Sequence, residues 1–143
     1  MSSIVYNTFK GKDGNNWTAG ADSAYKVMLV TASYAPNVDH DFVSDVVANE
    51  IAGGSYARQN VATRTKAIDD SGDVATHSAD NPMFTALAGP AAPRYAIVYR
   101  VVTTDSDHQV VCCIDLGTGL SIVGDFMVKW SGGASSGILF SAS

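Results

Sequence analysis

Two apolar segments joined by a short polar link constrain the fold most strongly. Residues 94–104 read RYAIVYRVVTT, and residues 108–117 read HQVVCCIDLG. Both are rich in Val, Ile and Tyr, which favour β-strands. Asp105, Ser106 and Asp107 lie between them as a polar link of hairpin length. We therefore predict an antiparallel β-hairpin at this place in the chain.

Further strand signals precede and follow this hairpin. Residues 24–33 (AYKVMLVTAS) contain a continuous apolar run, so we expect both faces of this strand to be covered. Residues 120–131 (LSIVGDFMVKWS) and 136–141 (SGILFS) continue the series towards the end of the chain. Several short strands with turn residues between them predict a single, mainly β domain over residues 1–143, built as a β-sandwich or a jelly-roll-like barrel.

One segment departs from the β pattern. Its apolar residues recur at spacings of one, three and four, and they are Phe42, Val43, Val46, Val47 and Ile51. This spacing is typical of one face of a helix, and Gly53-Gly54 follows as a stop signal. We therefore predict one inserted α-helix over about residues 39–52, which covers one side of the sandwich.

The amino-terminal residues 1–20 form a segment of their own. SIVYNTF at 3–9 has the pattern of a short extended stretch, and KGKDGNN at 10–16 interrupts it with glycine and asparagine. We predict an extended N-terminal arm here. The sequence has neither a signal-type start nor an apolar run of about 20 residues, so we expect folding in the cytoplasm and no membrane partner.

Composition limits the classes of partner. Of the 143 residues only 16% are charged, and the formal net charge is −5. The basic residues are scattered singly, without the cationic stripe that a phosphate backbone requires, so we expect no nucleic-acid partner. Cys112 and Cys113 are adjacent inside an apolar run, where strand geometry sends them to opposite faces. We predict that both are buried free thiols.

A cluster of acidic residues around one histidine raises the question of a metal or acid/base site. Asp39, His40, Asp41 and Asp45 are close in sequence. On a helix, however, Asp39 and Asp41 point away from each other, and no histidine follows at ligand spacing. We favour a structural role, in which the acids cap the first turn and complement the helix dipole. A metal-dependent hydrolase centred on these four residues is the competing hypothesis.

Other short motifs lack the context that their chemistry needs. The stretch 133–137 (GASSG) matches G-x-S-x-G, but no Asp, Glu or His follows it. The stretch 117–119 (GTG) leads into a β-like segment rather than a helix that would hold a pyrophosphate. His77 and His108 stand on polar segments without a second histidine or cysteine at ligand spacing. We predict no catalytic residue, no cofactor and no metal.

The longer sequence pattern resembles that of a known group of proteins. The pattern consists of AYKVMLVTASYAPNVDHDFVSDVVANEIAGGSYA at 24–57, then RYAIVYRV, VVCCIDLG and FMVKWSGGASSGILF. It resembles small structural proteins of tailed bacteriophages, best over residues 26–37 and 42–54. Among these it looks most like the head decoration, or cement, proteins.

The resemblance implies a function in adhesion. Such a protein is not an enzyme; it is made in the host cytoplasm, binds the outside of the capsid and bridges major capsid protein subunits, often as a homodimer or homotrimer. Ile4, Tyr6 and Phe9 of the N-terminal arm are then the candidate partner contacts. The alternative is a tail, neck or fibre module, including a glycan-binding one. Its candidate aromatic residues are Tyr56, Tyr95 and Trp130.

Overall fold

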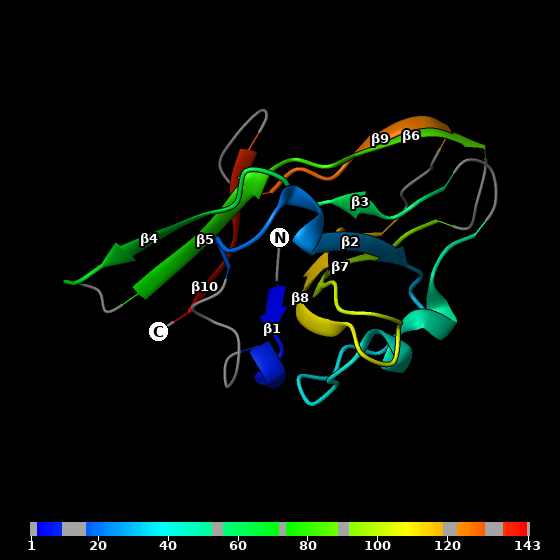
Figure 1. Ribbon diagram of the computed structural model, residues 1–143. Coiled ribbons are helices and arrows are strands. Elements are labelled where there is room, and N and C mark those ends of the chain that lie inside the picture. The colour runs from blue at the N-terminus through cyan, green and yellow to red at the C-terminus, as the bar shows by residue number, and fades with distance from the viewer. Residues whose placement is uncertain are drawn as a thin grey trace.

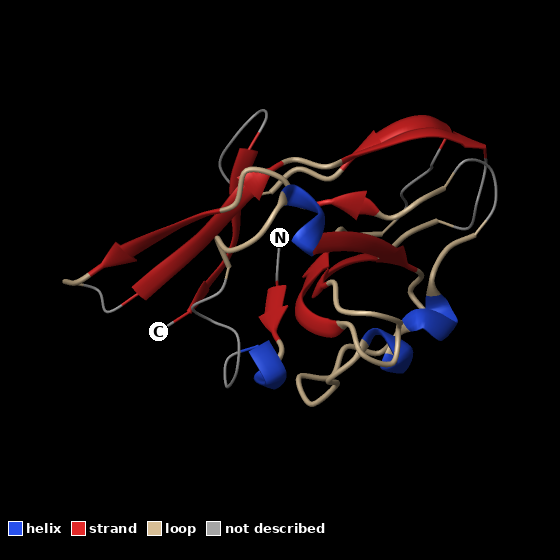
Figure 2. Ribbon diagram, in the orientation of Figure 1, coloured by secondary structure: helices blue, strands red, loops and turns tan. Residues whose placement is uncertain are grey.

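The computed structural model describes residues 3–9, 17–52, 56–71, 74–88, 92–118, 123–130 and 136–142. Its strands are β1 (Ser3–Val5), β2 (Tyr25–Val30), β3 (Gln59–Asn60), β4 (Thr65–Asp69), β5 (Val74–Asp80), β6 (Met83–Ala88), β7 (Tyr95–Arg100), β8 (Gln109–Asp115), β9 (Val123–Met127) and β10 (Ser136–Ala142). Its 3₁₀ turns are η2 (Asp22–Ala24), η3 (Val43–Asp45) and η4 (Val47–Asn49). The described chain is thus mainly β, as predicted (Figure 2).

A five-stranded antiparallel sheet with the order β1-β8-β7-β2-β3 forms the body of the protein (Figure 1). β7 and β8 pair from Tyr95 opposite Asp115 to Arg100 opposite Gln109, which confirms the predicted hairpin. The connection between them covers residues 101–108 and is longer than the predicted polar link. β2 pairs with β7 along its full length.

Apolar side chains cover both faces of the three central strands. We call the two resulting groups the first and the second core. The first core includes Trp17, Val27, Leu29, Phe84, Val98, Cys112 and Trp130. The second core includes Tyr6, Met28, Val30, Tyr34, Val43, Val46, Ile97, Tyr99 and Cys113. Successive β2 residues alternate between the two, so the prediction that both faces of this strand are covered is confirmed.

A β-bulge changes the alternation on β8. Val98 lies opposite Cys112, whereas the next residue, Tyr99, lies opposite Val110, so Val111 is the extra residue. Val111 and Cys112 therefore both belong to the first core although they are neighbours. The carbonyl of Val111 accepts a hydrogen bond of 3.0 Å from the Tyr6 amide, which ties the N-terminal segment to the bulge.

Two smaller sheets complete the described structure. One is three-stranded with the order β10-β5-β4, and the other pairs β6 with β9. Figure 1 shows β4 and β5 extending away from the five-stranded sheet. His77 and Ala79 of β5 are buried, whereas Ile68 on β4 is 70% exposed. One end of this sheet is therefore anchored and the other projects.

The N-terminal segment packs onto the sheet in its described part. β1 pairs antiparallel with β8, and residues 7–9 form a short helical turn. The Tyr6, Phe9 and Trp17 side chains are each at most 2% exposed. The described residues among 1–20 are thus held in the fold of their own chain rather than standing free as an arm.

Residues 39–52 do not form the predicted α-helix. They form the two 3₁₀ turns η3 and η4, with extended backbone at both ends. The amide of Val110 on β8 donates to the Asp41 carbonyl at 3.1 Å, and the amide of Ile51 donates to the Leu29 carbonyl on β2 at 3.0 Å. An α-helix would use these same backbone groups within the segment. Pairing with two sheet strands therefore replaces helical hydrogen bonds.

The helical spacing of the apolar residues still has a structural cause. Val43 lies in η3 and Val46 lies between η3 and η4. Both side chains are fully buried in the second core. Ile51 instead belongs to the first core, on the opposite face of the sheet. The apolar residues that we assigned to one face of a helix therefore pack on two different faces of the sheet. Valine is also β-branched, which disfavours a helix and suits this irregular backbone better.

Arg64 fixes the loop that precedes β2. Its guanidinium donates to the carbonyl oxygens of a run of residues, with distances of 2.7 to 3.5 Å: Trp17, Ala19, Gly20, Ala21, Asp22 and Val61. The same group lies 4.6 Å from the centre of the Tyr25 ring. Gly20 has a φ of +83°, and a Cβ there would lie 2.9 Å from the Cβ of Ala24.

No helix in the described part of the chain is long and apolar enough to span a bilayer.

Replacing Val43 by alanine tests whether the segment 39–52 seals the second core. Val43 is fully buried, so the lost methyl groups and the resulting cavity lower the free energy of unfolding by about 1–3 kcal/mol. Val102→Ala, at a side chain that is 52% exposed, is the control and changes it by less than about 0.5 kcal/mol. Urea unfolding of both variants measures the difference, and equal effects would contradict this packing.

Candidate functional site

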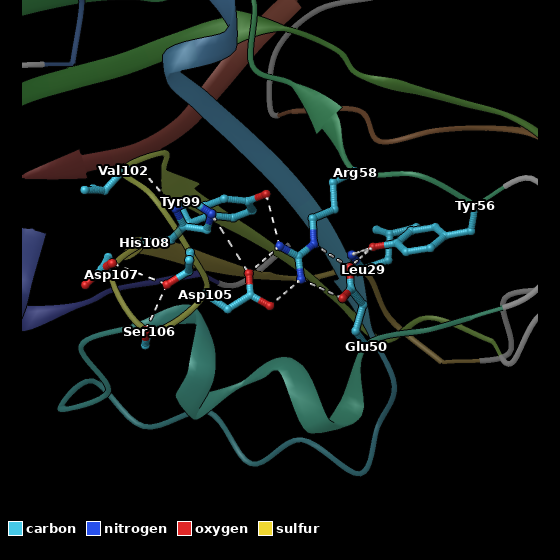
Figure 3. Close-up of polar contacts among 11 residues, drawn as sticks. Leu29, Glu50, Tyr56, Arg58, Tyr99, Val102, Asp105, Ser106, Asp107 and His108 are labelled. Atoms are coloured by element: carbon cyan, nitrogen blue, oxygen red, sulfur yellow. Dashed lines mark hydrogen bonds and ion pairs between the residues drawn. The ribbon is translucent and has the colours of Figure 1, made fainter.

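The most extensive charged cluster in the described residues centres on Arg58 (Figure 3). Its Nε and Nη2 donate to the two oxygens of Glu50, both at 2.8 Å. On the other side, Nη1 and Nη2 donate to Asp105 at 2.8 and 3.3 Å. The Tyr99 hydroxyl accepts from Nη1 at 3.3 Å, and the guanidinium carbon lies 5.4 Å from that ring's centre. We call Glu50, Arg58 and Asp105 the clasp.

Three separate parts of the chain supply the clasp. Glu50 ends the η4 turn and forms a β-bridge with Val30 on β2. Arg58 lies just before β3, and Asp105 lies in the connection between β7 and β8. Because Arg presents a planar fork of donors, one side chain satisfies two carboxylates at once. The clasp therefore joins the segment after η4, the residue before β3 and the connection after β7.

A half-buried tyrosine, Tyr56, connects the clasp to the first core. The Tyr56 hydroxyl donates to Glu50 Oε2 at 2.6 Å and accepts from the Leu29 amide at 3.1 Å. The Tyr56 ring stacks on Phe84 of β6, with 5.9 Å between ring centres. The first core and the charged cluster are thus connected through one side chain.

Arg58 and Asp105 of the clasp, and Tyr56 beside it, keep fixed charge states near neutral pH. Hydrogen bonds from Arg58 hold the pKa of the Asp105 carboxyl below its ordinary value. Hydrogen bonds to Glu50 raise the pKa of Arg58, and burial raises the pKa of Tyr56. These three groups do not change charge near neutral pH, as a general acid or base must. The arrangement is suited to holding segments together.

A second polar network lies beneath the 34–40 loop. The Tyr6 and Tyr34 hydroxyls are 2.8 Å apart, and the Tyr34 hydroxyl is 2.8 Å from His40 Nδ1. Asn7 donates from its side chain to Asp39 at 2.8 Å. Burial raises the pKa of both tyrosines, so they act as neutral hydrogen-bonding groups. This network fixes the loop on the N-terminal segment.

The residues considered for a metal site take structural roles. Asp39 and His40 belong to the network beneath the 34–40 loop. Asp45 accepts hydrogen bonds of 3.1 Å from the amides of Asp41 and Phe42, which is the capping role we favoured, at a 3₁₀ turn instead of an α-helix. Among the residues that the structure describes, no three His, Cys, Asp or Glu side chains are grouped to hold a metal.

The candidate partner contacts in the N-terminal segment belong to the protein's own cores. Tyr6 is fully buried in the second core, and Phe9 lies in the first. Ile4 is half-buried and packs against the second core. In this structure Tyr6 and Phe9 offer no surface to another molecule, because the sheet and its covering loops already enclose them.

The three aromatic residues considered for glycan binding are placed differently from one another. Trp130 is 2% exposed, and its Nε1 donates to the Asp80 carbonyl at 2.8 Å. Tyr56 is committed to Glu50 through its hydroxyl. Tyr95 is half-buried and packs edge-on against Tyr34, with 5.9 Å between ring centres. The three do not form one aromatic surface.

The cysteines and glycine motifs are also located. Cys112 and Cys113 are buried and free, as predicted, and they lie in different cores. Burial raises the pKa of both thiols, that of Cys113 to about 12. Gly117 has a φ of +92° and forms a turn whose amide donates to Asp115 at 2.8 Å. The G-x-S-x-G match at 133–137 lies largely outside the described residues.

One pocket of about 280 Å³ lies beside the loop that Arg64 fixes. Its lining residues are Ala19, Gly20, Ala24, Tyr25, Arg100 and Val101. Small side chains and backbone form most of this wall, and Arg100 is the charged member. The lining contains no Ser, Cys, His, Asp or Glu, so it does not provide a nucleophile paired with a general base of the usual kind.

Sequence analysis missed the clasp. Glu50 and Arg58 are eight positions apart, whereas Asp105 lies 47 positions after Arg58. No local spacing predicts such a group, because the pairing of β2 with both β3 and β7 and the bridge between Val30 and Glu50 bring the segments together. The available signal was the scarcity of charge: in a chain with 16% charged residues, an arginine close to the aromatic Tyr56 calls for a partner.

Comparison of the chain with protein-family models, curated proteins and solved structures gave no match.

Removing Arg58 tests the clasp as a structural element. Arg58→Ala leaves two carboxylates without their partner, so we expect the free energy of unfolding to fall by about 2 kcal/mol. Arg58→Lys keeps the charge but loses the planar fork, and it costs about 1 kcal/mol. Lys129→Ala, at an exposed lysine, serves as the control. Denaturant unfolding measures all three, and an Arg58→Ala effect no larger than the control's would contradict the clasp.

The pKa of Asp105 provides a second test. Its carboxyl is held below its ordinary pKa by Arg58, so its contribution to stability is present above about pH 4 and is lost as pH falls through the folded-state pKa. In Arg58→Ala we expect the Asp105 pKa to rise towards its ordinary value. A carbon-detected NMR titration of the side-chain carboxyl in both proteins measures the change. An unchanged titration would show that Arg58 is not the cause.

Proposed function

We propose that this chain is a non-enzymatic structural protein of a tailed-phage virion. It binds the outside of the assembled capsid, contacts the major capsid protein and bridges neighbouring subunits, so that the head is stabilised. The resemblance in residues 26–37 and 42–54 suggests this class of protein. The projecting β10-β5-β4 sheet is the structural observation that supports an adhesive role.

The projecting sheet offers the kind of surface that another protein can use. β4 is an edge strand, and Thr65, Ala67 and Ile68 on it are exposed. Ile68 is 70% exposed, which is unusual for an isoleucine on a strand. Edge strands present unpaired backbone groups, and exposed apolar residues gain free energy when a partner covers them. A partner bound here is held away from the body of the protein.

The low charge of the chain fits repeated contacts between proteins. A single small contact of this kind gives modest affinity, but copies bound side by side on a shell act together. The clasp and the two cores make the body a stable base from which the sheet projects. A homodimer or homotrimer would multiply the number of contacts further.

Binding to capsid shells tests the proposal. The purified protein is mixed with expanded shells of the phage that encodes it, and bound protein is measured after sedimentation. We expect stoichiometric binding. Ile68→Asp should weaken it about tenfold or more, because a carboxylate replaces apolar surface at the proposed contact. Val38→Asp, at a valine that is 38% exposed elsewhere, is the matched control. Absence of binding to shells, or binding to tails or fibres instead, would overturn the proposal.

A further inference from the structure

One histidine, His108, forms a hydrogen bond across the connection between β7 and β8. Figure 3 shows His108 beside Val102, and the Val102 amide donates to His108 Nδ1 at 2.9 Å. An amide N–H can bond to Nδ1 only when that nitrogen carries no proton. In this geometry the imidazole is therefore neutral, with its proton on Nε2. The His108 side chain is 12% exposed, and the bond itself lies at the surface, where Val102 is 52% exposed.

The same connection holds the segment that covers the second core. The Val43 amide donates to the His108 carbonyl at 2.9 Å, and the Ser44 amide donates to the Asp105 carbonyl at 2.8 Å. Within the connection, the amides of Asp107 and His108 both donate to the Thr104 carbonyl at 2.8 Å. The position of His108 is thus coupled to the start of η3.

We propose that residues 101–108 form an acid-sensitive latch. Protonation of His108 at Nδ1 converts an acceptor into a donor that faces the Val102 N–H, so the bond between them is lost. The imidazole must then turn away, and the connection loosens its hold on residues 43–44. In this way acid opens one edge of the covering over the second core.

The charged groups around His108 have opposite effects on its protonation. From its own connection, Asp105 Oδ1 lies 4.0 Å from Nε2, and Asp107 is also near; both favour the imidazolium. Arg58, before β3, and Lys26, on β2, oppose it.

From β7, the Tyr99 ring packs on the imidazole, with 5.2 Å between centres, and adds no charge because burial raises its pKa. Asp105 already binds Arg58 at 2.8 Å, which reduces its attraction for a second cation.

The direction of the pH effect follows from burial. Burial is the largest cause that lowers the pKa of His108, and the neighbouring acids offset it only in part. The neutral form is therefore favoured in the folded protein. Its contribution is fully present above about pH 6.5, the ordinary histidine pKa, and is lost as pH falls towards the folded-state pKa. The latch opens on the acid side.

NMR of the wild-type protein tests the latch directly. At about pH 7.5 the side-chain nitrogen shifts of His108 should show the neutral tautomer with its proton on Nε2. Between about pH 7.5 and pH 5, exchange of the Val102 and Ser44 amides, corrected for intrinsic rates, should accelerate about tenfold or more. The amides of Val98 and Cys112, at the centre of the sheet, should keep their protection. A tautomer with the proton on Nδ1 would overturn the proposal.

Two histidine variants make the test specific. In His108→Asn the side-chain oxygen takes the place of Nδ1 as an acceptor and does not titrate, so the acid-induced exchange at Val102 should disappear. His40→Asn removes a histidine that contacts a different loop and should leave the acid response as in wild type. If Val102 and Ser44 respond to acid equally in wild type and His108→Asn, the latch does not exist. Should His108→Asn fail to fold, the wild-type tautomer and amide exchange still decide the matter.

Discussion

Coverage of both faces of strands β2, β7 and β8 is the constraint on which the rest of the structure depends. A sheet of antiparallel strands is stable with one face in water, but these strands carry apolar side chains at nearly every position. Two coverings are therefore needed. The β6–β9 pair and the anchored end of β5 contribute to the first core, and the N-terminal segment with residues 34–47 closes the second. The loops are shaped by this requirement more than by their own propensities.

The features that sequence predicted are those encoded by neighbouring residues. The hairpin of β7 and β8 follows from two β-favouring segments around a polar link, the double burial of β2 from a continuous apolar run, and the opposite orientation of the two cysteines from the alternation of side chains along a strand. The helix over 39–52 was wrong because its backbone groups pair with Leu29 and Val110, and no local pattern reports such long-range hydrogen bonds. The clasp was missed for the same reason. Ile4, Tyr6 and Phe9 were chosen as arm contacts because an apolar segment near a terminus has no assigned neighbour until the sheet is known.

Charge plays a small but localised part in this fold. The shortest ion pairs among the described residues join separate loops and strand ends: Arg58 with Glu50 and Asp105, and Arg94 with Asp115. Each arginine also packs on a tyrosine ring of the sheet. Apolar burial supplies most of the stabilisation and requires that loops cover the sheet, and the directional polar contacts then fix where each loop lies. In this chain the planar, multidentate guanidinium group supplies that specificity at a few positions.

Arg64 is a further arginine that fixes the course of a loop. Arg64 holds the loop before β2 through main-chain carbonyls, which every amino acid possesses, and the side chains of Trp17 and Asp22 add hydrogen bonds at the two ends of the loop. Its shape is therefore encoded by a residue more than 40 positions away. Substitutions within residues 18–21 can accumulate without altering the backbone, apart from the strained position Gly20, while Arg64 itself is constrained. The side chains of such a loop can therefore change while its backbone keeps the same course.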